Sequence, residues 1–483
     1  MHARIILAVT IAYFALLMLV SRLTTRKSAS GSKVFFNGGR QSPWWAVAIS
    51  MIGTSISGVT FVSVPGMVAA SQFSYMQMVL GFIAGYAAVA FILLPLYYNL
   101  KSIYAFLETR FGRIGRVTGA VFFLVSKYLG CGVRMFLTAS VLQMFLFDPL
   151  GIPFAVNVAL TMLIVWGYTF RGGVKTLVWT DMFQTLAMLG AVVLCIIFAA
   201  NQLGLDFHGL VSTVSGSPLS RTWFFDDPLD KRYFWKQFLA GAFTVVAMTG
   251  LDQDMMQKNL SCRNLREARI NVLSYGVAFV PVNLLFLALG VLLYTFKERI
   301  GIEIAGPDSL FPTIATGYMP AAVGVLFILG LVAAGFSSSG SALTALTSSF
   351  TLDILEADKK RSGKSLDRVC RLVHAANAVL MGLLICAFSA LRETSVINAV
   401  YTIAGYTYGP LLGLFCFGLI SKRELRRPLV PAVCILAPVL TAILAANSER
   451  WFGGYQMGFE ILLVNAALTC LGLAAITKKA GTH

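Results

Sequence analysis

The chain has 483 residues, of which 57% are hydrophobic and only 12% are charged, and its mean hydropathy is +0.78. A soluble domain carries about 25% charged residues, so this composition excludes a water-soluble protein. The net charge of +17 does not indicate a nucleic-acid partner. The excess Lys and Arg fall between apolar segments, where the cytoplasmic loops of membrane proteins carry them.

The apolar residues form continuous runs long enough for a membrane-spanning helix, which needs roughly 20 residues. A β-barrel would instead show alternating segments of about ten residues. We therefore predict an all-α polytopic membrane protein with about 13 transmembrane helices. These spans are expected at residues 4–21, 44–70, 75–98, 115–146, 152–169, 176–200, 237–257, 270–296, 319–350, 370–390, 396–420, 428–446 and 457–476.

The basic residues predict how the chain is threaded through the bilayer. With the N-terminus outside, most of the 38 Lys and Arg lie in inside loops, such as 22–40, 258–269 and 359–371. Cytoplasmic loops carry the excess of Lys and Arg. We therefore expect a multi-pass protein of the cell (inner) membrane with its N-terminus outside and its C-terminus in the cytoplasm.

Two of the predicted spans contain residues that interrupt a helix. The second holds GTSISG (Gly53–Gly58) followed by Pro65 and Gly66, and the seventh holds TGLDQD (Thr249–Asp254). Interrupted spans at corresponding places in two halves are typical of inverted-repeat transporters, whose binding site lies at the midplane. The alternative is that Gly and Ser only let helices pack closely.

Four segments, in the right order along the chain, resemble the sodium:solute symporter family. They are YAFLETRFG (104–112), VWTDMFQ (178–184), LDQDMMQKNL (251–260) and VAAGFSSSGSALTALTSSFTLDIL (332–355). The resemblance runs from roughly residue 35 to 425. It implies a leucine-transporter-like fold with a five-plus-five inverted repeat and broken helices in spans 2 and 7. The corresponding units are 1–43 (first span and loop), 44–200 (first repeat), 201–420 (second repeat) and 421–483 (two last spans).

The resemblance also implies a sodium site between the second and ninth spans. Ser337 and Ser338 match the family's two serine ligands, and Ala334 matches a carbonyl ligand in the same span. Gly53 and Ile56 match the carbonyl ligands of the broken span. Sodium is a hard cation that needs several oxygens, and a broken helix frees carbonyls to supply them. The alternative is that the serines bond only to their own helix.

Asp181 is a candidate ligand for a second sodium ion. In some family members the matching acid binds this ion together with serines of the ninth span. Ser337 and Ser341 are retained here, but Gly340 stands where such members carry a further serine, which argues against a second ion. The alternative is that Asp181 caps the start of its helix behind Thr180.

Arg134 lies midway along an apolar span, where a cation needs a counter-charge or a ligand. A guanidinium can bind a carboxylate through two parallel hydrogen bonds. By resemblance, Arg134 stands where sialic-acid symporters place the arginine that binds the substrate carboxylate, with Ser57 and Thr60 near it. The alternative is an internal ion pair with Asp181 or Asp252.

The predicted substrate residues are Ser55, Ser57, Thr60, Gln77, Arg134 and Thr402. Thr60 and Thr402 stand where sodium–galactose symporters would carry glutamines. Asp252 and Asp254 are expected to cap helices or to form an intracellular gate, and Lys127 to reach the surface or to pair with an acid. Aromatic residues that could line or gate the pocket are Phe73, Tyr75, Tyr401, Tyr406 and Tyr408.

These features favour a sodium-coupled symporter, with Na⁺ as its cofactor, that imports a small anionic solute through the lipid bilayer and works as a monomer. A carboxylated sugar such as sialic acid or a uronate is the leading solute, and a neutral sugar or a small monocarboxylate or vitamin anion is the alternative. An ion channel would need a filter sequence, which we do not find. We predict no enzyme, because the four histidines stand singly or at the termini.

Overall fold

The computed structural model describes residues 3–26, 40–98, 100, 102–170, 173–389 and 396–478. The regular structure of these residues is helical, apart from two isolated β-bridges, which join Ser42 to Cys262 and Leu425 to Thr477. The all-α class is therefore confirmed. The α-helices are α1 (Ala3–Arg26), α3 (Trp44–Ser55), α4 (Gly58–Ser71), α5 (Tyr75–Ala88), α6 (Leu94–Tyr97), α7 (Ala105–Leu142), α8 (Phe154–Thr169), α9 (Gly173–Gln202), α10 (Phe207–Gly216), α11 (Phe234–Val245), α12 (Gln253–Asn259), α13 (Leu265–Ile300), α14 (Leu310–Gly317), α15 (Ala321–Ser349), α16 (Ala357–Lys360), α17 (Gly363–Phe388), α18 (Val396–Ile420), α19 (Val430–Ala446), α20 (Ser448–Trp451) and α21 (Ile461–Ala475).

Many of these helices are long and apolar enough to cross a membrane. Among the described residues, eight pass this test singly, and a ninth span results if the bent pair α3–α4 is counted as one. Further apolar helices, such as Phe154–Thr169 and Ile461–Ala475, are shorter. The chain is thus a multi-pass membrane protein, while the count of thirteen spans and the division into repeats stay predictions.

Helices α3 and α4 are bent by 58° relative to each other. The bend lies at Ile56 and Ser57, whose backbones are extended, with φ −82° and ψ 91° at Ile56. A helix leaves its last four carbonyl groups without partners inside the helix. The last turn of α3, which contains Gly53, therefore presents carbonyl oxygens to the interior of the protein.

A second interruption follows α11. The helix continues as a π-helical turn over Val246–Gly250, leaves helical geometry at Leu251 and Asp252, and resumes as α12. The Asp252 carboxylate caps α12 by accepting hydrogen bonds from the backbone N–H groups of Asp254 and Met255. The new helix can begin there because the side chain satisfies two otherwise unpaired donors.

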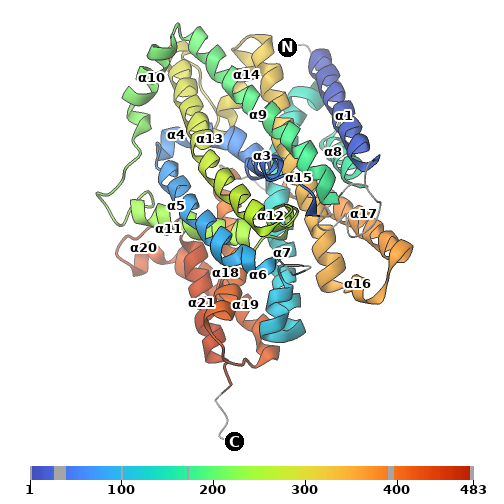
Figure 1. Ribbon diagram of the computed structural model, residues 1–483. Helices are drawn as coiled ribbons and strands as arrows, with labels where there is room; N and C mark the ends of the chain where they lie inside the picture. The colour runs from blue at the N-terminus through green and yellow to red at the C-terminus, as the bar shows by residue number, and fades with distance from the viewer. Residues whose placement is uncertain are drawn as a thin grey trace, which may run out of the picture.

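The broken helix α3–α4 crosses the middle of the bundle, where α9, α13 and α15 surround it (Figure 1). Helices α3 and α9 approach so closely that a Cβ atom on Gly53 would collide with the Thr185 hydroxyl. That hydroxyl donates to the carbonyl of Ile49, at 2.9 Å, and so ties the two helices together. The close approach brings the acid of α9, Asp181, next to the end of α3.

Candidate substrate and sodium site

A cavity of about 110 Å³ lies beside the break between α3 and α4. Its walls come from the broken helix and from α5, α7, α11, α12, α13, α15 and α18. The polar and charged residues among its lining include Thr54, Ser55, Ser57, Thr60, Lys127, Arg134, Thr244, Thr249, Asp252, Asp254 and Ser338. The cavity therefore joins both interrupted segments with the serine-rich helix α15.

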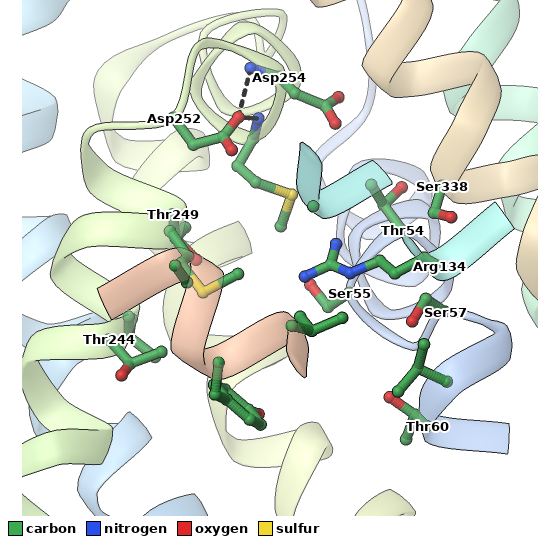
Figure 2. Close-up of a pocket in the computed structure, with 18 of the residues that line it drawn as sticks. Thr54, Ser55, Ser57, Thr60, Arg134, Thr244, Thr249, Asp252, Asp254 and Ser338 are labelled. Atoms are coloured by element: carbon green, nitrogen blue, oxygen red, sulfur yellow. Dashed lines mark hydrogen bonds between the residues drawn. The ribbon is translucent and has the colours of Figure 1, made fainter. Parts of the chain in front are cut away.

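Arg134 reaches into this cavity from α7. Figure 2 shows its guanidinium extending toward the centre of the pocket, with Ser55 and Ser57 beside it. Within the described part of the chain, this guanidinium makes no ion pair and no hydrogen bond with a protein group. The pairing with Asp181 or Asp252 that we considered as an alternative is absent, because both acids bind lysines instead.

Three of the predicted substrate hydroxyls line the same cavity as Arg134. Those of Ser57 and Thr60 make no hydrogen bond among the described residues, so they are available to a solute. The Ser55 hydroxyl lies 2.6 Å from the Tyr275 hydroxyl, which also binds Tyr86. Ser57 and Thr60 are therefore the hydroxyls best placed to bind a solute together with the guanidinium.

The other two predicted substrate residues lie outside the central cavity. Gln77 is buried, donates to the carbonyl of Arg232 at 2.8 Å and accepts from the Phe224 N–H at 3.1 Å, so it anchors the segment before α11. Thr402 lines a second cavity of about 300 Å³, together with Arg232 and Lys231. Arg232 pairs with Asp230 at 2.8 Å, and its hydrogen bonds hold the pKa of that carboxyl below its usual range.

Two tyrosines separate this second cavity from the central one. Tyr75 and Tyr401 line both cavities, and their hydroxyls lie 2.9 Å apart. Of the other aromatic candidates, Tyr408 lines the central cavity, whereas Phe73 and Tyr406 are not among its lining residues. Because the second cavity is built from segments that we predict to face outside, we interpret the tyrosine pair as a barrier on the outer side of the central cavity.

A buried ionic cluster lies at the α12 end of the central cavity. Lys127 Nζ is 3.0 Å from Asp252 Oδ2 and 2.7 Å from Asp254 Oδ2, and Tyr408 donates to the same Asp252 oxygen at 2.5 Å. The lysine side chain is 10% exposed and both acids are 3% exposed. Lys127 thus pairs with acids rather than reaching the surface, and Asp252 both caps α12 and joins α7 to α18.

We expect Lys127→Ala to destabilise the protein by about 3–5 kcal/mol, because removing one partner of a buried ion pair leaves uncompensated charge. The measurement is thermal unfolding of the purified protein in detergent. The double variant Lys127→Ala/Asp254→Asn should recover part of the loss. Lys359→Ala is the matched control, since Lys359 pairs with Glu356 but is 52% exposed. An unfolding temperature equal to that of wild type would show that the cluster is not a structural element.

The residues predicted to bind sodium lie at the end of α3 and in the middle of α15, two helices that contact each other. The Ser337 hydroxyl oxygen is buried and has no hydrogen-bond partner among the described residues. The Ser338 hydroxyl lines the cavity and donates to the Gly335 carbonyl at 3.2 Å. A buried hydroxyl without a partner costs free energy, and a bound sodium ion would satisfy it. The residues present therefore fit a sodium ion.

Asp181 is paired with a residue that sequence reasoning did not single out. Lys258 Nζ lies 2.5 Å from Asp181 Oδ2 and also donates to the Thr54 hydroxyl. Ser341 donates to the same Asp181 oxygen at 2.9 Å. Lys258 was counted among the basic residues of the loop 258–269, but its side chain is 1% exposed. The assignment of Lys258 to a cytoplasmic loop was therefore wrong, because Lys258 lies in α12 and its side chain contacts Thr54 at the end of α3.

The sequence profile of the Sodium:solute symporter family matches residues 35–427 of the chain. The chain belongs to this family. Its members are transporters that use sodium as the coupling ion, so the predictions of a sodium-coupled symporter and of a protein that is not an enzyme are confirmed. The four quoted segments, whose order suggested this family, all lie within the matched range.

Relatives within the family carry different solutes. The chain is 26% identical over 476 residues to the sodium/sialic acid symporter NanT of Aliivibrio fischeri, which covers 94% of this chain and 90% of the relative. It is 29% identical over 408 residues to sodium-coupled monocarboxylate transporter 1 of Mus musculus, covering 80% of this chain and 64% of the relative.

This chain has the same fold as a protein of known structure. It is a Na⁺-coupled sialic acid symporter in a substrate-bound outward-open state. The TM-score is 0.81 at 21% sequence identity, over 98% of this chain and 99% of the other. The predicted fold class is thereby confirmed, while the assignment of individual ligands stays a prediction.

Proposed function

We propose that this symporter imports a carboxylated sugar, such as a sialic acid or a uronate, across the inner membrane, with its N-terminus outside and its C-terminus in the cytoplasm. The observation that carries the proposal is the guanidinium of Arg134 in the central cavity, which, like the neighbouring hydroxyls of Ser57 and Thr60, has no partner in the part of the chain that the structure describes. A cation held inside a membrane protein without a counter-charge favours binding of an anion. The similarity to sialic acid symporters supports the same solute.

The sodium ion binds, in this proposal, to the Ser337 and Ser338 hydroxyls and to the carbonyls of Gly53, Ile56 and Ala334. Ion and solute then meet at the same broken helix, since Ser57 directly follows Ile56. Binding of sodium would fix the bend and with it the positions of Ser57 and Thr60. The solute would bind tightly only when the ion is present, which is the requirement for coupling.

A small monocarboxylate is the second candidate. It is favoured by the similarity to a monocarboxylate transporter and would use the same guanidinium. Such a solute needs one bidentate contact with Arg134 and no sugar hydroxyls. The two candidates differ in whether Ser57 and Thr60 contribute to binding.

The test is uptake of radiolabelled N-acetylneuraminate into proteoliposomes that contain the purified chain. We expect accumulation under an inward sodium gradient, none under an equal potassium gradient, and loss of accumulation when an ionophore dissipates the gradient. Competition by glucuronate, glucose and lactate then ranks the solute classes, and counterflow distinguishes a carrier from a channel. No accumulation of N-acetylneuraminate, together with sodium-driven uptake of radiolabelled lactate that glucuronate does not inhibit, would favour the second candidate.

A further inference from the structure

The Lys258 ammonium lies against one oxygen, Oδ2, of the Asp181 carboxylate, the acid that we predicted as a ligand of a second sodium ion. The ammonium also contacts the Thr54 hydroxyl, and the Ser341 hydroxyl binds the same carboxylate oxygen. The Asp181 side chain is 0% exposed and that of Lys258 is 1% exposed. One carboxylate and neighbouring hydroxyls are the oxygen ligands of a hard cation, and here a compact ammonium with three N–H donors binds among them.

The space for a further oxygen ligand on α15 is also filled. A Cβ atom on Gly340 would collide with the Tyr168 hydroxyl, which donates to the Phe336 carbonyl at 2.6 Å. A serine at this position would therefore displace a buried and hydrogen-bonded tyrosine. The glycine and the tyrosine together remove the ligand that Ser341 and Asp181 would need to complete a sodium shell.

We propose that the Lys258 ammonium is a tethered cation in place of a second sodium ion, so that this symporter binds one sodium ion, at Ser337 and Ser338. This inference rests on the proposed sodium site at Ser337 and Ser338 and specifies the stoichiometry of the coupling. A sodium ion at Asp181 would have to share one carboxylate with the Lys258 ammonium. Two positive charges bound to the same carboxylate repel each other strongly in a buried site. The lysine ammonium is covalently attached and cannot dissociate from the carrier, whereas a sodium ion binds and dissociates in each transport cycle.

The experiment is equilibrium binding of ²²Na⁺ to the purified full-length protein, without solute. We expect one saturable sodium per chain in wild type. Lys258→Ala and Lys258→Gln, which remove the charge, should bind two. Lys258→Ala/Asp181→Asn and the charge-preserving Lys258→Arg should return to one. The Gln variant keeps most of the side-chain volume, so it provides a second readout if the Ala variant does not fold.

Thermal unfolding gives an independent readout. Sodium should raise the unfolding temperature of Lys258→Ala more than that of wild type, and the additional shift should disappear in the double variant. Two sodium ions per wild-type chain, reduced to one by Asp181→Asn, would overturn the inference. So would a single sodium in both charge-removing variants.

Failure of the proposed sodium site at Ser337 and Ser338 gives a different result. In that case wild type binds no sodium and Ser337→Ala changes nothing. Even then, the inference about Lys258 would be supported if Lys258→Ala bound one sodium ion and Lys258→Ala/Asp181→Asn bound none.

Discussion

Arg134→Ala should weaken binding of an acidic solute by about 2–5 kcal/mol, which corresponds to roughly 30- to 5,000-fold in Kd. The guanidinium has no protein partner among the described residues, so the solute carboxylate would be its counter-charge. Arg134→Lys should also bind the acid poorly, because an ammonium keeps the charge but loses the bidentate geometry. The measurement is the affinity for N-acetylneuraminate and for its methyl ester, which lacks the carboxylate charge.

The decisive comparison is between acid and ester. Wild type should prefer the acid strongly, and Arg134→Ala should bind the two nearly equally. Arg232→Ala is the matched control, because that arginine lines the second cavity and already pairs with Asp230. If Arg134→Ala lost the same affinity for acid and ester, Arg134 would have a structural role and the carboxylate would have to bind elsewhere.

Ser337→Ala should weaken sodium binding at least about tenfold. Even the outer partners of metal ligands contribute 10- to 100-fold to metal affinity, so loss of a direct ligand should cost no less. In the absence of sodium the same variant should be as stable as wild type or more stable, because it removes a buried hydroxyl that has no hydrogen-bond partner among the described residues. The measurements are the sodium dependence of uptake and thermal unfolding with and without sodium.

Its neighbours in α15 provide the comparison. Ser338→Ala should also weaken sodium binding, because the Ser338 hydroxyl belongs to the same predicted shell. Ser339→Ala is the control, since its hydroxyl already donates to the Gly335 carbonyl at 2.7 Å. Equal sodium affinity in Ser337→Ala and Ser339→Ala would remove Ser337 from the ion site.

Much of the fold could be predicted because the signals are local. Apolar runs fix the class of protein, and the sequence GTSISG marks the place where α3 ends and α4 begins. The cavity position of Arg134 was also predictable, because a charged side chain in the middle of a membrane span faces the interior of the helix bundle or a cavity rather than lipid. These inferences need only the sequence near each residue.

The partners of the charges were harder to predict, because they depend on how distant helices pack. Lys258 directly follows the predicted seventh span (237–257) and precedes Arg263, Arg266 and Arg269, so its local pattern is that of a cytoplasmic loop. Only the turn into α12 brings it to Asp181, 77 positions earlier in the chain. Gln77 was misleading for the same reason, since its amide binds the segment before α11. The sequence gives one indication of this ion pair. Asp181 is an acid in an apolar predicted span, and such an acid needs a cationic partner from elsewhere in the chain or a bound cation.

The contacts that close the two ends of the central cavity differ in the free energy that is needed to break them. Toward the second cavity, the polar contact is the hydrogen bond between Tyr75 and Tyr401, which contributes about 0.5–1.5 kcal/mol, and the two rings also pack against Phe82 and Phe459. The Lys127 cluster at the α12 end combines two ion pairs with a tyrosine hydrogen bond, and breaking a buried pair costs about 3–5 kcal/mol. We therefore expect the tyrosine pair to separate at a lower free-energy cost than the cluster. We expect an empty carrier built in this way to open more readily toward the second cavity than past the Lys127 cluster, which would limit the leak of ions between transport cycles.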